Sequence, residues 1–544
     1  MNRVLGLLFF ALFAAVAWSW LAVERAGAEL AQEHLQHRVS HPGWTFPVRI
    51  WSAPVPLSAP TGVLAANAQV RGYEPMCPPE EPGQYCPETD DVLPRGGLFS
   101  EGPQPPGLMG WSRQVALEPV RIGTLVGADG ELREHLPLAL VPEHMKAVFR
   151  ALRTFEGMPP MSERVVDTLL GPGEASSRLK RLVLGNAALR TLRDRGVTQV
   201  FVDGPCFDRF KVKGYPPGTK RICGIQAAAR GHWGVEPWNL SLAESASIVA
   251  FLVHPERPRA FADRLLDKLS PERWDLATAR RELVAAHGGY SPGLYTEHEV
   301  YAPFVAAVRS WLEGRLEPGQ YAQGIDVFTS LDVLAQQRSA SLLGASPDTV
   351  AAAVVDTESG MLVAAVGAPW TQAADHLETS NPSPLPSALV SRRPSPVSTA
   401  AALATLVRGG LRGSADTVSS MVDAGGRLLH LHEPSDSQVV RPSLAWRYLR
   451  GLRWPMVETQ GFGMRLMGTI GGIRGESSRW YVGASPYRAT SLVVRTPEEE
   501  GGPDLERLWA VWMRSMHEGL APMGFARPSM GFETEGTSLI GLQV

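Results

Sequence analysis

The chain has 544 residues and carries 52 Lys and Arg against 55 Asp and Glu, a net charge of −3. A chain of this length exceeds a single hydrophobic core and predicts two or three domains. Because there is no net positive charge to attract a polyanion, a nucleic-acid-binding protein is disfavoured.

The first feature along the chain is an apolar segment, Val4 to Val23, with Arg3 before it and Trp18 and Trp20 near its end. About twenty apolar residues span a bilayer as a helix, and tryptophan favours the interface. We therefore expect residues 1–23 to be a single-pass anchor in the inner (cytoplasmic) membrane, with the bulk of the chain extracytoplasmic or periplasmic. The alternative is a cleaved signal peptide processed near residues 26–28, although a signal core is usually shorter.

The four cysteines fit an exported chain. Cys77 and Cys86 are nine residues apart, and Cys206 and Cys223 are seventeen apart. These spacings suit two local disulfide bonds, but four cysteines permit three pairings, between which the sequence does not choose. Neither pair has CxxC spacing and no histidine pair accompanies them, so we expect no metal site. Nothing in the sequence points to a cofactor.

Residues 24–115 are rich in Pro and Gly and show little periodicity, which predicts an irregular juxtamembrane segment. Amphipathic helices are predicted over residues 142–155 and 177–195. A further helix is predicted after Asn239, because a capping residue precedes an apolar run and Glu244 lies in the first turn. Taken alone, these patterns indicate only a buried helical core.

Two stretches resemble a known family. Residues 224–255, GIQAAARGHWGVEPWNLSLAESASIVAFLVHP, resemble the closing segment of the family 51 peptidoglycan glycosyltransferase domain. Residues 321–334, YAQGIDVFTSLDVL, resemble the strand that joins this domain to the transpeptidase of class A penicillin-binding proteins. The resemblance implies a multidomain α+β chain. A mostly α, lysozyme-like glycosyltransferase domain would occupy residues 116–320, and a shortened α/β transpeptidase-like domain residues 321–544.

The resemblance places altered residues at both glutamates of the glycosyltransferase family. Polymerising a lipid-linked disaccharide requires a carboxylate that deprotonates the attacking hydroxyl. Matching the family helix to residues 148–154 puts Arg153 there, and a guanidinium is no base near neutral pH. Gln199 falls at the second glutamate, and the family's GGSTITQQLAKN segment has no counterpart. The remaining candidate acids are Glu156, on the same helical face as Arg153, and Glu163.

Between Cys206 and Cys223 the chain is basic, with Lys211, Lys213 and Arg221. One interpretation is a solvated loop. The other is that these cations bind anionic glycan or lipid head groups.

The C-terminal half keeps the order of the transpeptidase elements, and the whole resemblance covers about residues 116–530. Residues 351–367, 395–410 and 422–434 resemble a hairpin, a helix and a second hairpin of that family. Fewer than thirty residues separate Gly367 from Ser395, where the family carries its serine nucleophile and lysine. No lysine follows Lys268, so neither an SxxK nor a KTG motif can occur there.

We therefore expect a catalytically inactive relative of class A penicillin-binding proteins. Its predicted role is binding, scaffolding or regulation in peptidoglycan synthesis. The predicted partners are the inner membrane and cell-wall synthesis or envelope proteins, with glycan or a lipid-linked precursor as a further ligand and without nucleic acid. Two alternatives stay open: a divergent, active glycosyltransferase without transpeptidase activity, and a structural module of an envelope apparatus.

Overall fold

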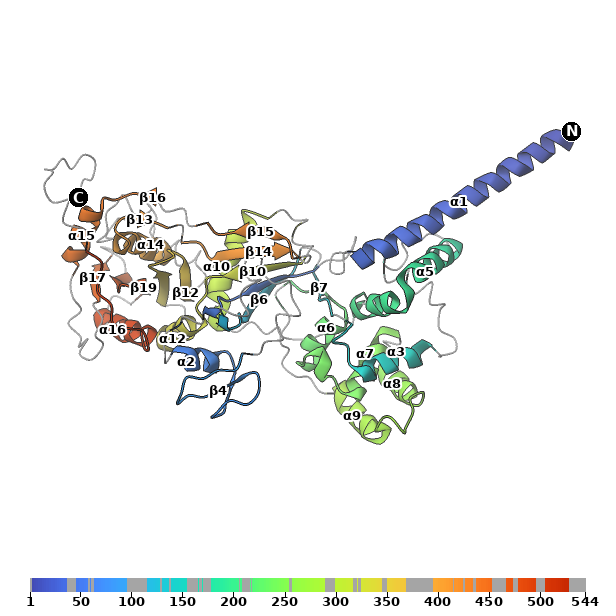
Figure 1. The fold of residues 1–544 in the computed structure, drawn as a ribbon, viewed down its shortest axis with the longest axis horizontal. Coiled ribbons are helices and arrows are strands. Elements are labelled where there is room, and N and C mark those ends of the chain that lie inside the picture. The colour runs from blue at the N-terminus through green and yellow to red at the C-terminus, as the bar shows by residue number, and fades with distance from the viewer. Residues whose placement is uncertain are drawn as a thin grey trace.

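The computed structural model describes residues 2–36, 46–56, 63–94, 115–127, 130–136, 138–153, 178–204, 206–207, 218–253, 257–288, 299–316, 324–344, 350–367, 395–413, 415–423, 426–433, 437–452, 466–472, 478–495 and 504–527, and a few single residues between these ranges. These residues form a helical lobe and a sheet-containing lobe, with one long helix projecting from the helical lobe (Figure 1).

The helical lobe contains helices and one small sheet, whose strand β7 (Glu131–Arg133) lies at the edge facing the other lobe (Figure 1). Its helical elements are α3 (Glu143–Arg153), α5 (Arg178–Asp203), α6 (Ile225–Ala228), the π-helix η3 (Ala229–Trp233), the 3-10 turn η4 (Pro237–Asn239), α7 (Leu242–Val253), α8 (Pro258–Leu266) and α9 (Leu276–Gly288). Its strands are β7 (Glu131–Arg133), β8 (Cys206–Phe207) and β9 (Arg221–Cys223), with β9 in the middle. The helices predicted over residues 142–155, over residues 177–195 and after Asn239 are confirmed as α3, α5 and α7. The start of α7 is fixed by a capping box, in which the backbone N–H groups of Ser241 and Glu244 each donate to the other residue's side chain.

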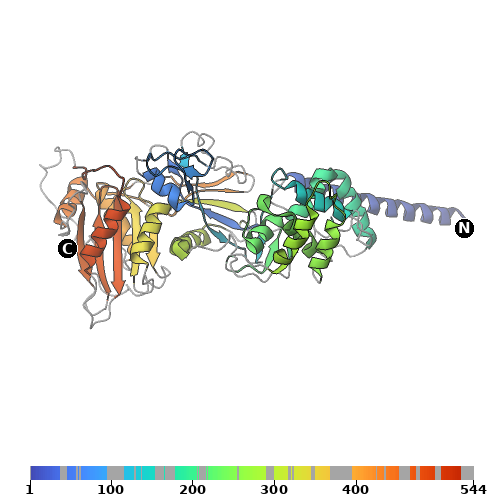
Figure 2. The same cartoon turned by 90° about the horizontal axis from the view of Figure 1, so that it is seen from below.

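Helix α1 (Asn2–Gln36) projects from the helical lobe and continues well past Val23 (Figures 1 and 2). Its second half packs along α5, where a Cβ atom on Gly27 would lie 2.5 Å from the Leu184 carbonyl oxygen. Glycine therefore permits the close approach of the two helices, and Glu24 adds an ion pair with Arg190. Within the described part of the chain, no helix combines the length and the apolarity needed to cross a membrane. The anchor at residues 1–23 stays a prediction.

The sheet-containing lobe has two five-stranded sheets. The first has the order β15-β14-β10-β1-β6, built from β1 (Val48–Trp51), β6 (Arg121–Leu125), β10 (Ile325–Thr329), β14 (Val418–Asp423) and β15 (Leu428–Leu431). Strand β1 runs parallel to β10 and antiparallel to β6. Arg49 on β1 donates to Asp326 on β10 at 2.6 Å.

This placement corrects the prediction that residues 24–115 are irregular. Besides β1, that range contributes β2 (Val55–Pro56), α2 (Val63–Val70), β3 (Glu74–Pro75), β4 (Gln84–Tyr85) and part of β5 (Val115–Leu117). The physical reason is pairing with distant segments, since the buried side chains of β1 find their partners on β6 and β10. A four-residue strand is too short to show a period of its own.

The second sheet is antiparallel throughout, with the order β12-β11-β19-β18-β17. Its strands are β11 (Val350–Asp356), β12 (Leu362–Gly367), β17 (Met467–Gly472), β18 (Ser478–Ala484) and β19 (Arg488–Arg495). Helix α14 (Pro396–Val407) covers one face, and α12 (Val333–Leu343) and α16 (Leu505–Met516) cover the other, as the layers of Figure 1 show. The remaining elements are η5 (Glu299–Tyr301), α10 (Ala302–Glu313), β13 (Leu411–Arg412), β16 (Ser437–Gln438) and α15 (Pro442–Gly451).

Close packing of α16 on the second sheet depends on one glycine. The indole of Trp509 lies directly over Gly483 on β18, where a Cβ atom would come within 2.2 Å of the ring. The same indole donates to Thr490 Oγ1 at 2.7 Å, and Trp512 donates to Ser339 Oγ at 2.8 Å. Both tryptophans are fully buried, so α16 is fixed by apolar area and by two indole hydrogen bonds.

Candidate functional site

The side chain of Gln199 lies near the C-terminal end of α5. Its amide nitrogen donates to the Leu136 carbonyl oxygen at 2.9 Å and to Asp203 Oδ2 at 2.6 Å. Both partners are acceptors, so only a side chain with a hydrogen-bond donor satisfies them. The residue that the resemblance sets at the family's second glutamate is therefore engaged in a network internal to the helical lobe.

Asp203, the last residue of α5, is the centre of this network and is fully buried. Its carboxylate accepts from Gln199, from the Leu136 backbone N–H at 3.0 Å and from His135 Nδ1 at 2.7 Å. A buried carboxylate is stable only when hydrogen bonds or charges replace its water. The three donors supply that replacement.

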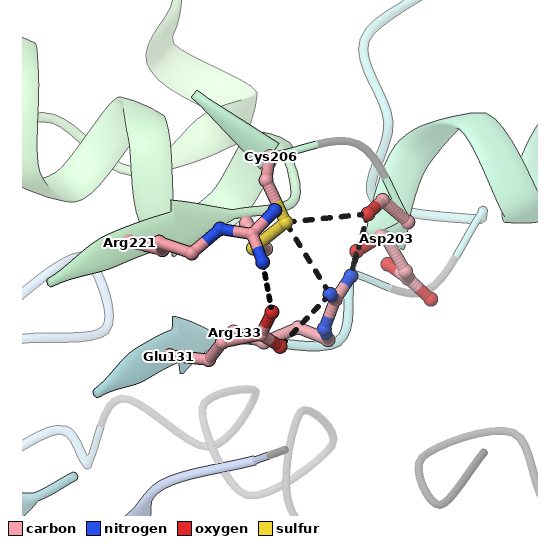
Figure 3. The surroundings of a disulfide bond; sticks show 7 residues. Glu131, Arg133, Asp203, Cys206 and Arg221 are labelled. Atoms are coloured by element: carbon pink, nitrogen blue, oxygen red, sulfur yellow. Dashed lines mark hydrogen bonds and ion pairs between the residues drawn. A yellow bond between two sulfur atoms is a disulfide. The ribbon is translucent and has the colours of Figure 1, made fainter. Parts of the chain in front are cut away.

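Arg133 on β7 holds the chain where α5 ends (Figure 3). It is 2% exposed, and its Nη1 donates to the carbonyl oxygens of Asp203 and Gly204 at 2.6 and 2.7 Å. Its Nη2 contacts Glu131 at 3.2 Å and Cys206 Sγ at 3.5 Å. Burial lowers the pKa of Arg133, and the Glu131 carboxylate opposes that shift.

A second buried carboxylate lies one residue after β7. Glu134 accepts from Arg121 on β6 and from Arg230 on η3, both at 2.7 Å. Arg230 also pairs with Glu236 at 2.8 Å. Because β6 belongs to the first sheet and η3 to the helical lobe, this carboxylate ties the two lobes together.

The other predicted site residues are placed as follows. Arg153 is the last residue of α3, and its side chain lies outside the described part of the structure. Glu156, Glu163, Lys211 and Lys213 also lie outside the described residues. Arg221 on β9 pairs with Glu131 at 3.2 Å and its side chain is 44% exposed.

Both expected local disulfide bonds are present. Cys77 is bonded to Cys86, and Cys206 to Cys223. The second bond joins β8 to β9 directly beside Arg133 (Figure 3). It therefore belongs to the same buried cluster as Asp203 and Gln199.

The sheet-containing lobe has a polar pair of another kind. His517, at the end of α16, donates from Nδ1 to the Met513 carbonyl oxygen, and its Nε2 accepts from Ser485 Oγ, both at 2.6 Å. Burial lowers the pKa of His517 to about 4. Ser485 is fully buried, and its Oγ also accepts the backbone N–H groups of Tyr487 and Arg488. The pair resembles a nucleophile and its base in composition, but its hydrogen bonds join α16 to the β18–β19 turn.

These contacts limit what the charged cluster can do chemically. A general base must present a carboxylate to a substrate hydroxyl. Glu131, Glu134 and Asp203 each accept from two or more groups of the protein itself. The cluster as described stabilises the junction of α5, β7 and β9.

Sequence reasoning missed most of this cluster. The run Glu131-Leu132-Arg133-Glu134-His135 is unusually charged for a strand and the turn after it, and it was the one available signal. Charged residues rarely lie in a buried strand unless they are paired. The pairing itself was not visible, since Asp203 lies 68 positions after His135.

No protein-family model matches the sequence, and no curated protein matches it. Among solved structures, the chain is similar to penicillin-binding protein 1A from Haemophilus influenzae, with 12% identity and a TM-score of 0.42 over 75% of this chain and 92% of that one. It is similar to the penicillin-binding protein PonA1 from Mycobacterium tuberculosis, with 14% identity and a TM-score of 0.35 over 42% of this chain and 94% of that one. A peptidoglycan synthetase from Bifidobacterium adolescentis gives 12% identity and a TM-score of 0.28 over 38% of this chain and 64% of that one. The likeness to the penicillin-binding protein fold is distant.

Proposed function

We propose that this chain is a membrane-anchored, non-catalytic component of peptidoglycan synthesis that binds, scaffolds or regulates other proteins of the cell envelope. The observation that carries the proposal is the position of Gln199. Its amide donates to a backbone carbonyl and to a buried carboxylate, where the resembling family has a glutamate.

The surroundings of Gln199 would not accept the family residue unchanged. A glutamate there would direct its carboxylate at Leu136 O and at Asp203 Oδ2, which lie 2.9 and 2.6 Å from the present donor. Like charges at this distance in a buried site repel strongly. The network therefore supports a structural use of the position in place of proton transfer.

The sheet-containing lobe supports the same proposal from its sequence. Acyl transfer of the penicillin-binding type uses a serine and a nearby lysine, and a KTG strand lines the pocket. The resemblance sets residues 468–472, GTIGG, at the position of that motif. They lie within β17, and no lysine follows Lys268.

Attachment to the inner membrane through residues 1–23 is part of the proposal. In the described part of α1, Phe13 and Trp18 are 72% and 74% exposed, and Val16 is 59% exposed. Large apolar side chains exposed together on one helix favour an apolar surrounding over water. Trp18 and Trp20 near the end of the segment fit the bilayer interface.

The test is a polymerisation assay in vesicles that contain the full chain together with a purified, active peptidoglycan glycosyltransferase and lipid-linked disaccharide. We expect the chain to change the rate of the active enzyme, and vesicles with an unrelated single-pass protein at the same density are the control. An unchanged rate, combined with polymer made by the chain alone, would overturn the proposal.

A second experiment asks whether the basic segment binds the lipid-linked precursor. Charge reversal at Lys211, Lys213 and Arg221 should weaken retention of the labelled precursor by the chain, and reversal at the exposed pair Arg280 and Arg281 on α9 is the matched control. Equal retention by both variants would remove the precursor from the proposed ligands.

A further inference from the structure

The Cys206–Cys223 disulfide holds a very short strand, which is otherwise fixed by its pairing with β9 and by the buried side chain of Phe207. Strand β8 has two residues, and its two register pairs with β9 are Cys206 with Cys223 and Phe207 with Ile222. Strand β9 is also paired along its length with β7, through three parallel register pairs. Breaking the disulfide would therefore loosen β8, beginning at Cys206, while β9 stays in place.

The two sulfur atoms differ in access. Cys223 is fully buried, whereas Cys206 is partly exposed. An external thiol therefore reaches Cys206 first. The sulfur that is attacked bonds to the reagent, and the other sulfur leaves.

The two sulfur atoms also differ in charge environment (Figure 3). Arg133 Nη2 lies 3.5 Å from Cys206 Sγ, in a guanidinium that is almost fully buried. A neighbouring cation stabilises a thiolate over a thiol, more strongly where water is excluded. Glu131 opposes this effect, because its carboxylate lies within 4.8 Å of both sulfur atoms, but it is itself paired with Arg133 and Arg221.

We propose that Cys206–Cys223 is a thiol–disulfide exchange site, at which an extracytoplasmic dithiol attacks Cys206 and Arg133 stabilises the Cys206 thiolate that is finally released. The attacking thiolate forms a mixed disulfide with Cys206, and the electron pair of the broken bond leaves on Cys223, which takes up a proton. The second thiol of the reagent then closes the reagent's own disulfide and releases Cys206. Two electrons pass from the dithiol to the chain.

Opening this bond has a structural consequence at the cluster around Gln199. Arg133 also donates to the carbonyl oxygens of Asp203 and Gly204, immediately before β8. In the reduced chain Arg133 gains a charged partner in the Cys206 thiolate, and β8 is no longer covalently tied to β9. The exchange therefore loosens β8 directly after the part of the chain that Arg133 holds at the end of α5.

The second disulfide provides an internal control. Cys77 is exposed and Cys86 is buried, so access at Cys77–Cys86 is at least as good as at Cys206. Among the described residues, no guanidinium or ammonium group hydrogen-bonds to either of those sulfur atoms. If the Cys206 thiol ionises at a lower pH than the Cys77 thiol, the cause is therefore Arg133 and not a difference in access.

The experiment measures the alkylation rate of single free thiols against pH in the full chain. Cys223→Ser leaves Cys206 free, and Cys86→Ser leaves Cys77 free as the exposed reference. We expect the pH midpoint for Cys206 to lie at least about one unit below that for Cys77, which is about tenfold more thiolate at neutral pH. Arg133→Met, added to Cys223→Ser, should return the midpoint to that of Cys77, and Arg133→Lys should keep most of the difference.

A midpoint for Cys206 equal to or above that of Cys77 would overturn the proposal, as would a low midpoint that Arg133→Met leaves unchanged. If a variant fails to fold, the proposal is tested on the wild-type chain instead. Treated with glutathione, it should form the mixed disulfide on Cys206, and amide exchange should rise at Cys206 and Phe207 in β8 while β7 and β9 stay protected. A mixed disulfide on Cys223, or exchange that rises equally in all three strands, contradicts the assignment.

Discussion

The helical lobe and the second sheet of the other lobe solve the problem of buried polar groups in different ways. In the helical lobe the polar centre is charged, with Asp203, Arg133 and Glu134 all buried and each bound by several partners. In the second sheet of the other lobe the buried polar contacts are made by neutral groups, such as Ser485 with His517 and Trp509 with Thr490. Its ion pairs, from Arg488 to Asp356 and Asp332, are partly exposed.

Substitutions of buried polar residues should therefore have different costs in the two regions. A buried charge requires complete pairing, so removing one partner leaves an uncompensated ion. Removing one partner of a neutral pair leaves a neutral polar group unsatisfied, which costs less than an unpaired ion. The charged cluster of the helical lobe is therefore stable only when all its partners are present. For this reason position 199 requires a side chain that donates a hydrogen bond to Asp203.

The largest effect is expected for Asp203→Ala. It removes the acceptor of three hydrogen bonds and should destabilise the helical lobe by about 3–5 kcal/mol. Ser485→Ala, the matched change in the other lobe, should cost about 1–2 kcal/mol. Amide exchange of α5 and of β18 in the full chain measures each lobe separately. If both substitutions lowered the free energy of unfolding equally, buried charged and buried neutral groups would not differ as we expect.

The next effect is a pH dependence confined to the sheet-containing lobe. The pKa of His517 is lowered from 6.5 to about 4 by burial, so the unfolded lobe binds the proton more readily than the folded one. Stability from this residue is full above pH 6.5 and is lost as the pH falls towards 4. The loss is about 3 kcal/mol.

His517→Gln should remove most of this dependence. The measurement is amide exchange of α16 at a series of pH values, corrected for the intrinsic rate. A wild-type lobe equally stable at both ends of the pH range would contradict the neutral, buried state of His517.

A smaller effect, about 1–3 kcal/mol, is expected for Gln199→Glu at neutral pH. The new carboxylate would face Asp203 and Leu136 O, so its pKa should rise and the penalty should disappear as the pH falls and it takes up a proton. Gln199→Met serves as the control, because it loses the hydrogen bonds without adding charge and should show no such relief. Exchange of α5 at two pH values separates the variants.

The smallest effect is expected for Arg221→Ala. Its ion pair with Glu131 is partly exposed, and such pairs contribute between about 0 and 1 kcal/mol. Thermal unfolding of the full chain should therefore change little. A large loss of stability would show that the outer part of the cluster is as dependent on pairing as Asp203.

Helices and hairpins could be predicted where the residues that determine them are close together in the sequence. The start of α7 was visible because Ser241 and Glu244 cap each other across three positions, and the β11–β12 hairpin was visible as two apolar runs around a turn. Strand β1 was not visible, because Arg49 finds Asp326 at a separation of 277 residues.

The candidate site shows the same limit. Spacing suggested both disulfide bonds, and the resemblance directed attention to Gln199. Asp203 lies four positions after Gln199 on α5, so helical spacing alone allows that contact. The contact with Leu136 O was not visible in the sequence, since only folding brings α5 and the turn after β7 together. Arg133 was missed for the same reason, because its partners Asp203 and Gly204 are 70 and 71 positions away.

The most direct test of the central claim is glycan polymerisation by the full chain alone, in vesicles supplied with lipid-linked disaccharide. The account predicts no polymer from the wild-type chain, and no gain from Gln199→Glu, because that carboxylate would be directed into the buried network. Polymer made by the wild-type chain and abolished by Glu156→Gln would contradict it.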